Sequence, residues 1–191
     1  MTKCLKPFQG QFPCGQCMPC RIARTSEWVT RMLDESEGKD SCFITLTYGE
    51  GNLPENGTLV KRDLQLFIKR LRKFVEPVKI KYFACGEYGS KNDRPHYHLI
   101  VVGWKPDPLR CSRPDRKNLS SVDIQDLWPF GINVVGSVTS DSIQYVVGYV
   151  RKKIIGVGQK AEYSDRLPPF QLQSQGIGKE VIEKKKLSSL M

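Results

Sequence analysis

The stretch that decides the fold is residues 79–104, KIKYFACGEYGSKNDRPHYHLIVVGW. Two runs rich in aromatic and β-branched residues, 79–89 and 94–104, flank a short polar loop at 90–93. Such runs are typical of β-strands, and a short polar connection between them predicts an antiparallel hairpin. The surrounding chain is therefore expected to be built on a sheet.

The rest of the chain alternates helical and strand patterns. Residues 60–75 have the clearest helical periodicity, with apolar residues on one face and Lys and Arg on the other. The remaining predictions are a helix over 21–36 with Ile22, Trp28, Val29, Met32 and Leu33 on its apolar stripe, strands over 41–48 and 131–138, a short helix from Ser121 or Asp123 to Leu127, and a helix from Asp141 or Ser142 to Lys153. This order predicts an α+β fold: a mostly antiparallel sheet of about four to five strands flanked by helices, of ferredoxin-like or RNA-recognition-like architecture.

Composition indicates a basic protein that acts on nucleic acid. Lys and Arg number 30 against 20 Asp and Glu in 191 residues, a net charge of +10, and such an excess usually serves a polyanionic partner. No apolar run approaches the roughly 20 residues of a membrane helix, and no secretory signal pattern is present, so we expect a protein without membrane contact. We divide the chain into a Cys-rich arm (1–20), one domain (21–155) and a weakly packed basic tail (156–191).

A metal site is predicted on the hairpin. His96 and His98 are the only two histidines, and alternation along a strand places both on one face. Glu87 joins that face if the hairpin pairs it with either histidine. Two imidazoles and a carboxylate form an open site that suits Mg²⁺ or Mn²⁺. The alternatives are a pair of core histidines and a plain surface carboxylate.

Two tyrosines are predicted on one face of the helix that ends near Lys153. Tyr145 and Tyr149 are separated by four residues, and Lys152 continues the same stripe. A phenol with a pKa near 10 is a poor nucleophile at neutral pH, but a nearby ammonium group and a metal-polarised phosphate would offset this. The alternative is that both rings pack in the core and the lysine is simply solvated.

The arm and one loop offer further candidate sites. Cys4, Cys14, Cys17 and Cys20 could hold a structural Zn²⁺; free thiols and an iron–sulfur cluster are the alternatives. The Pro-rich loop 105–118 is basic and is expected to contact the DNA backbone. The candidate DNA-binding residues are Arg110, Arg113, Arg116 and Lys117 of this loop, together with Lys153.

These motifs together resemble the HUH endonucleases. The H-x-H strand at 96–98, the TLTY strand at 45–48 and the Y-x-x-x-Y-x-x-K helix at 145–152 are similar to those of rolling-circle replication initiators from microviruses, particularly the gokushovirus branch. PCGQCMPCR (13–21) and PPFQLQSQGIG (168–178) are also similar to that branch.

The resemblance implies an HUH fold and a metal-dependent nuclease that nicks and rejoins single-stranded DNA at a replication origin. It assigns metal binding to His96, His98 and Glu87, the nucleophiles to Tyr145 and Tyr149, and an accessory role to Lys152. It implies a 5′-phosphotyrosine intermediate, host helicase and polymerase as partners, and the host cell cytoplasm as location. The alternatives are a non-catalytic single-strand-binding module, and a transposase or relaxase with the same chemistry. Gly148 stands where some two-tyrosine members carry a lysine, which leaves the relative activity of the two tyrosines open.

Overall fold

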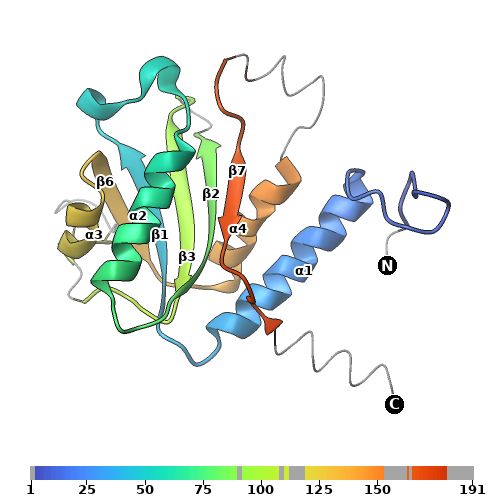
Figure 1. Ribbon diagram of the computed structural model, residues 1–191, viewed down its shortest axis with the longest axis horizontal. Coiled ribbons are helices and arrows are strands. Elements are labelled where there is room, and N and C mark those ends of the chain that lie inside the picture. Colours follow the sequence, from blue (N-terminus) through green and yellow to red (C-terminus); the bar gives the residue numbers. More distant parts are fainter. Residues whose placement is uncertain are drawn as a thin grey trace.

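The computed structural model (Figure 1) describes residues 3–89, 92–107, 110–111, 119–152, 163 and 165–179. In chain order its elements are α1 (Met18–Ser36), β1 (Ser41–Tyr48), the short 3-10 helices η1 (Glu50–Asn52) and η2 (Glu55–Gly57), α2 (Lys61–Phe74), β2 (Lys81–Tyr88), β3 (Pro95–Val102), β4 (Arg110–Cys111), β5 (Leu119–Ser120), α3 (Val122–Leu127), β6 (Gly131–Gly136), α4 (Ser140–Lys152) and β7 (Phe170–Gln173). Within these described residues, no helix has both the length and the hydropathy needed to cross a membrane.

The described strands form one sheet with the order β4-β5-β6-β1-β3-β2-β7, and every neighbouring pair is antiparallel. The predicted α+β fold with a mostly antiparallel sheet is confirmed, as is the hairpin of β2 and β3. The sheet is wider than the four to five strands expected. Its additional members, β4, β5 and β7, lie at the edges and are only two to four residues long, too short to produce a recognisable periodicity.

One face of the sheet is covered by α2 and α3 (Figure 1). Leu64, Phe67 and Leu71 of α2 are fully buried and pack in one cluster with Ile44 and Leu46 of β1. The alternating burial along β1 explains this arrangement, because every second side chain of a strand points to the same face. The basic side of α2 therefore faces away from the sheet.

The opposite face of the sheet is covered by α1 and α4. Trp28 and Met32 of α1 and Val146 of α4 form a second buried cluster with Phe83 of β2 and Ile100 of β3. Because His96 and His98 have the same strand parity as Ile100, they also belong to this face. The fold thus places the predicted metal ligands and the tyrosine helix on one side of the sheet.

The predicted apolar stripe of α1 is correct only in its middle. Ile22 and Leu33 are 41% and 40% exposed, whereas Thr25 and Glu35 are buried with Trp28. The face that α1 presents is set by its packing against α4, so the ends of the stripe extend beyond the contact.

The expectation of a weakly packed tail is wrong for residues 165–179. Here β7 pairs with β2, with Ala84 opposite Leu172, and Ile177 is fully buried against α1 and α4. The segment is short and polar on its outer side, so its pairing with a distant strand leaves little trace in local composition. The other boundaries of the predicted division stay predictions.

A buried carboxylate ties this segment to α1. Glu35 is 7% exposed and accepts hydrogen bonds from the ammonium groups of Lys39 (2.8 Å) and Lys81 (2.7 Å) and from the backbone N–H of Gly178 (2.9 Å). Burial alone would raise the pKa of Glu35, but these three donors outweigh it and hold the pKa below its ordinary value.

We expect Glu35→Gln to lower the free energy of unfolding by about 1–3 kcal/mol at neutral pH, because two ammonium groups lose a charged partner. Since the folded-state pKa is lowered, the carboxylate stabilises the protein above about pH 4.5 and this contribution is lost as pH falls below that value. Urea denaturation at several pH values measures both effects. Glu37→Gln, at an exposed position two residues away, is the control and should leave stability unchanged.

Candidate active site

The hairpin register brings the three predicted metal ligands to one end of the sheet. Glu87 of β2 lies directly opposite His96 of β3, which is one of the two registers predicted. On the other side of β3, Thr47 and Thr45 of β1 lie opposite His96 and His98. All five residues share one face, because directly paired residues in antiparallel strands point the same way.

His98 is held rigidly at the centre of this group. It is 5% exposed; its Nε2 lies 2.7 Å from Glu87 Oε1, and its Nδ1 lies 3.0 Å from Thr45 Oγ1. The ring of Phe43 stacks on the imidazole with a centroid distance of 5.8 Å and an interplanar angle of 10°. Both ring nitrogens are thus engaged, and the ring plane is set by packing.

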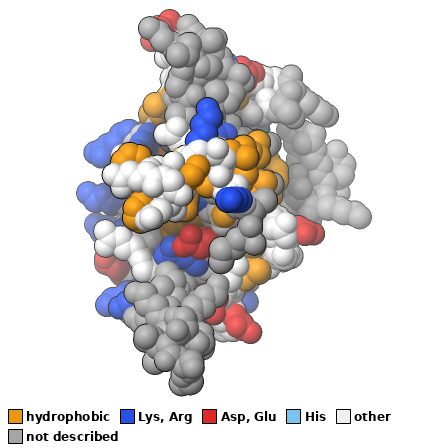
Figure 2. Space-filling model, turned by 90° about the vertical axis from the view of Figure 1, so that its right-hand side faces the viewer, with side chains coloured by type: hydrophobic (Ala, Val, Ile, Leu, Met, Phe, Trp, Pro, Cys, Tyr) orange, Lys and Arg blue, Asp and Glu red, His pale blue; other side chains and the backbone are white. Residues whose placement is uncertain are grey.

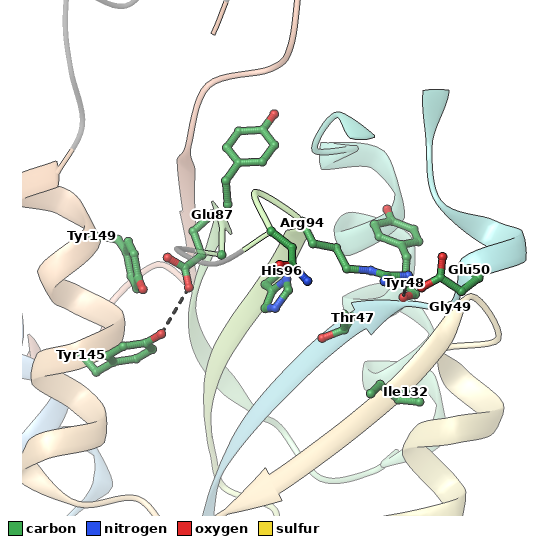
Figure 3. A pocket seen from close by; sticks show the side chains of 13 residues that line it. Thr47, Tyr48, Gly49, Glu50, Glu87, Arg94, His96, Ile132, Tyr145 and Tyr149 are labelled. Carbon is green, nitrogen blue, oxygen red and sulfur yellow. Dashed lines mark hydrogen bonds and ion pairs between the residues drawn. The ribbon is translucent and has the colours of Figure 1, made fainter. Parts of the chain in front are cut away.

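The helix α4 places both tyrosines over this group (Figure 3). The Tyr145 hydroxyl donates to Glu87 Oε1 at 3.2 Å, and the Tyr149 ring stacks on His98 with a centroid distance of 6.0 Å. The two phenol rings are perpendicular, with their centroids 5.3 Å apart. Tyr145 is 48% exposed and Tyr149 only 9%. Lys152 lies in the last turn of α4, but its side chain falls outside the described part of the structure.

Local sequence explains the position of α4. Thr139 caps the helix: its hydroxyl accepts from the N–H of Ser142 (3.1 Å), and the Ser142 hydroxyl accepts from the N–H of Thr139 (2.8 Å). The helix therefore begins at Ser140, one residue before the predicted start at Asp141 or Ser142. Val146 and Val147 are fully buried, which turns the tyrosine stripe toward the end of the sheet.

Burial and hydrogen bonding set the charges in the site. Burial raises the pKa of both Tyr145 and Tyr149, and the adjacent Glu87 carboxylate adds to the rise. Burial would also raise the pKa of Glu87, but hydrogen bonds from His98, Tyr149 and Tyr145 lower it. At neutral pH the site therefore holds an ionised carboxylate beside two neutral phenols, so a nucleophilic tyrosine needs an additional positive group.

These side chains line a pocket of about 850 Å³ (Figure 3). Arg94 forms part of its wall and is fixed by a 2.6 Å ion pair with Glu50 and a 2.9 Å hydrogen bond to the Tyr48 carbonyl. The pocket is wide enough for a segment of an unpaired strand. Its residues are Thr47, Tyr48, Gly49, Glu50, Glu87, Tyr88, Gly89, Asn92, Arg94, His96, Ile132, Tyr145 and Tyr149.

The pocket residues fit a divalent cation in their chemistry. His96 Nδ1 is buried and has no hydrogen-bond partner, as expected for a nitrogen reserved for a ligand, and Glu87 is ionised. The three groups do not converge on one point. Glu87 and His98 bond directly to each other, and the two imidazole centroids are 6.4 Å apart. A cation would therefore require a small rearrangement of these side chains.

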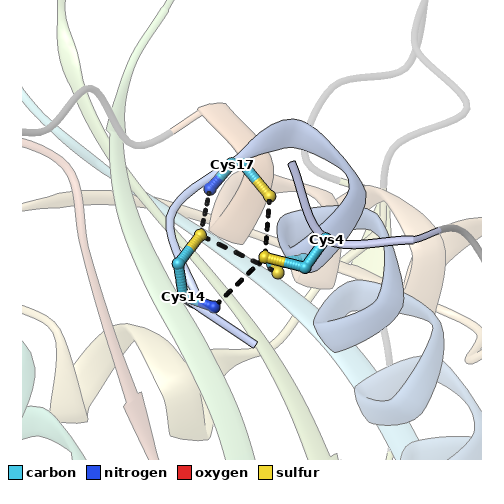
Figure 4. A group of neighbouring side chains, drawn as sticks. Cys4, Cys14 and Cys17 are labelled. Atoms are coloured by element: carbon cyan, nitrogen blue, oxygen red, sulfur yellow. Dashed lines mark hydrogen bonds between the residues drawn. The ribbon is translucent and has the colours of Figure 1, made fainter. Parts of the chain in front are cut away.

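The four cysteines of the arm do converge (Figure 4). The Sγ atoms of Cys4, Cys14, Cys17 and Cys20 all lie within 4.8 Å of one another, so this set could hold a metal ion such as zinc. Backbone N–H groups of Cys14, Gln16 and Cys17 donate to sulfur at 3.3–3.4 Å, an arrangement that favours thiolates.

The predicted DNA-contacting residues mostly lie where the structure makes no statement. Arg113, Arg116, Lys117 and Lys153 are outside the described residues, and Arg110 is described only in its backbone, as part of β4. Their roles stay predictions.

Comparison with known proteins identifies the family. A family model described as replication-associated protein ORF2 matches residues 41–154, from β1 through α4. The chain belongs to this family. It is 36% identical over 187 residues to replication-associated protein VP4 of Bdellovibrio phage phiMH2K, covering 91% of this chain and 58% of that protein. It is 35% identical over 179 residues to replication-associated protein ORF2 of Spiroplasma virus 4, with coverages of 87% and 55%.

A third relative of this ORF2-family chain is replication-associated protein ORF4 of Chlamydia phage 1, 31% identical over 186 residues and covering 91% of the chain and 46% of that protein. The chain thus spans about half the length of the curated relatives it matches. No solved structure matches it significantly. The predicted resemblance to replication proteins of small phages is confirmed.

Three residues of this ORF2-family site were missed by sequence reasoning. Thr45 bonds to His98, Phe43 stacks on the same ring, and Arg94 lines the pocket. A signal existed for the first two, since they alternate along β1 and share a face. Arg94 lies two residues before His96, but nothing in the local pattern indicates that it turns into the pocket.

Proposed function

We propose that this ORF2-family member is a metal-dependent endonuclease and strand transferase that nicks single-stranded DNA and thereby initiates rolling-circle replication. The observation that carries the proposal is the bond from Tyr145 to Glu87 Oε1, the oxygen that also bonds to His98. A potential nucleophile is thus in direct contact with the potential metal ligands, within a pocket open to a DNA strand.

The proposed reaction exchanges one phosphodiester for another. The Tyr145 oxygen forms a bond to phosphorus, the bond from phosphorus to the 3′ oxygen breaks, and the phenol proton ends on the departing 3′ hydroxyl. The 5′ phosphate stays on the tyrosine, and the free 3′ end is available to a polymerase. Mg²⁺ or Mn²⁺ held by His96, His98 and Glu87 would supply Lewis-acid polarisation of the phosphate.

We assign the first attack to Tyr145. Its ring is 48% exposed and faces the pocket, whereas Tyr149 is 9% exposed and stacked on His98. The bond to Glu87 orients the Tyr145 hydroxyl within the pocket, which serves the in-line geometry that phosphoryl transfer requires. Tyr149 would then act in the later strand transfer, after the first tyrosine is occupied.

The proposal includes the surroundings implied by this reaction. The substrate is single-stranded DNA at an origin, the partners are a host helicase and polymerase, and the location is the host cell cytoplasm. The arm cysteines would hold a structural Zn²⁺, separate from the catalytic ion. A transposase or relaxase would share the chemistry, but the matched relatives bear replication-associated names.

The decisive test is a denaturing gel of the protein with labelled single-stranded oligonucleotides, including origin-like sequences, and Mn²⁺ or Mg²⁺. We expect labelled DNA to migrate with the protein and to disappear from that position when EDTA is present at the start. Strong binding in a native gel without cleavage or adduct, with either metal, would contradict the nuclease function and favour the non-catalytic binding module.

A further inference from the structure

The N-terminal arm presents two exposed aromatic rings on a tight turn. The backbones of Phe8 and Phe12 bond to each other in both directions, at 2.8 and 3.0 Å, and the turn between them uses positive φ at Gln9 (49°) and Gly10 (72°). Phe8 is 66% exposed and Phe12 57%. Rings left in solvent contribute little burial energy to folding, so their exposure needs another reason.

The arm is positioned by its cysteines rather than by a core. It contributes no residue to either buried cluster, and Leu5 is 70% exposed. The described contacts that join its ends are those of sulfur: Cys4 Sγ lies 3.8 Å from Cys17 Sγ, and Cys14 Sγ lies 4.0 Å from Cys20 Sγ (Figure 4). Four thiolates in this arrangement suit tetrahedral Zn²⁺, and such an ion would fix the turn to the first residues of α1.

The charge of this region suits a polyanion. The first 26 residues contain Lys3, Lys6, Arg21 and Arg24 and no Asp or Glu. The region stays positive even when a zinc tetrathiolate, which carries two negative charges, is included. Figure 2, which views the molecule from this side, shows Lys and Arg side chains next to hydrophobic ones. Cations beside exposed aromatic rings are the combination that binds unpaired nucleotides.

The arm lies at the same end of the molecule as the candidate active site. Helices α1 and α4 pack against each other and run antiparallel, so the start of α1 lies near the end of α4, where Tyr149 is located (Figure 1). A groove of about 920 Å³ runs between the arm and α1, with Pro13, Arg24 and Trp28 in its walls. A strand that leaves the pocket along α4 would meet this groove and turn.

We propose that the arm, fixed by Zn²⁺ on Cys4, Cys14, Cys17 and Cys20, is a second single-stranded DNA site in which bases stack on Phe8 and Phe12. It holds the strand outside the nicking pocket. The inference rests on the proposed function only in its choice of substrate, and a protein partner for the two rings is the outcome that the test below would reveal instead.

Zinc is tested first, on the full chain purified without chelator. We expect one Zn²⁺ per chain by elemental analysis, and less than about one fifth of that in Cys14→Ser with Cys17→Ser. Full occupancy in this double variant, or its absence from the unaltered protein after reconstitution with Zn²⁺, would overturn the metal site.

DNA binding is tested by fluorescence anisotropy with labelled oligo(dT) of about 30 nucleotides. Stacking of one base is worth about 1–3 kcal/mol, so Phe8→Ala with Phe12→Ala should weaken binding by roughly tenfold or more. Phe8→Trp with Phe12→Trp should restore it. Leu5→Ala is the matched control, because it removes an equally exposed apolar side chain of the same arm that cannot stack, and it should leave Kd unchanged.

The outcomes separate this inference from the proposed function. An unchanged Kd in the double Phe variant would overturn the second site, even where the Tyr145 adduct forms normally. A weakened Kd with no adduct in any variant would leave the second site standing and contradict the nuclease instead. The adduct formed with a short oligonucleotide that reaches only the pocket should be the same in the double Phe variant and in the unaltered protein.

Discussion

Replacing Tyr145 and Tyr149 together with phenylalanine abolishes the covalent protein–DNA adduct, a loss on the order of 10⁴-fold or more. The effect is large because these are the two phenols that contact Glu87 and His98, and phenylalanine offers no oxygen to form a bond to phosphorus. Adduct formation on a denaturing gel measures the loss. Oligonucleotide affinity should change by less than about threefold, since the rings themselves stay in place and can still stack on bases.

Tyr82→Phe is the matched control for this experiment. It removes a phenol hydroxyl on the opposite face of the sheet, where Tyr82 packs against the α2 cluster, and it should leave adduct formation unchanged. A double variant that still forms a normal amount of adduct would show that another residue is the nucleophile.

The single variants distinguish the two tyrosines. With Tyr145 more exposed and bonded to Glu87, we expect Tyr145→Phe to reduce the initial adduct by about a hundredfold or more, and Tyr149→Phe to spare it but reduce rejoining of the strand. Pulse labelling followed by addition of an acceptor oligonucleotide separates the two steps. The reverse pattern would assign the first attack to Tyr149.

Glu87→Gln is the second large effect, a loss of nicking on the order of 10²- to 10⁴-fold at any concentration of Mn²⁺ or Mg²⁺. The amide keeps the shape of the side chain and can still contact Tyr145, but it removes the only ionised group beside the two histidines among the described residues. The rate of single-turnover cleavage, measured across a metal titration, gives the effect.

Glu50→Gln provides the control, because it neutralises a carboxylate that lines the same pocket but pairs with Arg94 instead of facing the tyrosines. Its rate should stay within about threefold of the unaltered protein, since an exposed ion pair contributes little. Equal losses in both variants would mean that the pocket responds to general charge, and would argue against a specific ligand role for Glu87.

Much of the candidate site was predictable because short-range periodicity sets it. Alternation along a strand places His96 and His98 on one face, and a four-residue spacing on a helix does the same for Tyr145 and Tyr149. The hairpin loop is short enough to restrict the register, so the pairing of Glu87 with His96 also followed from neighbouring residues.

Other features depended on contacts between distant parts of the chain. The bond from Thr45 to His98 spans 53 residues, the pairing of β7 with β2 brings residues 170–173 into the sheet, and Glu35 reaches Gly178 across 143 residues. No local pattern encodes such partners.

The sequence by itself determined the α+β class, the face of each chemically important residue and the membership of the family, because these follow from local spacing and motif identity. Only the tertiary structure decided that Tyr145 rather than Tyr149 is exposed, that the four cysteines meet within 4.8 Å, and that the tyrosine helix lies over Glu87. The physical reason is that side-chain direction is a property of the local backbone, whereas convergence and burial are set by how whole elements pack.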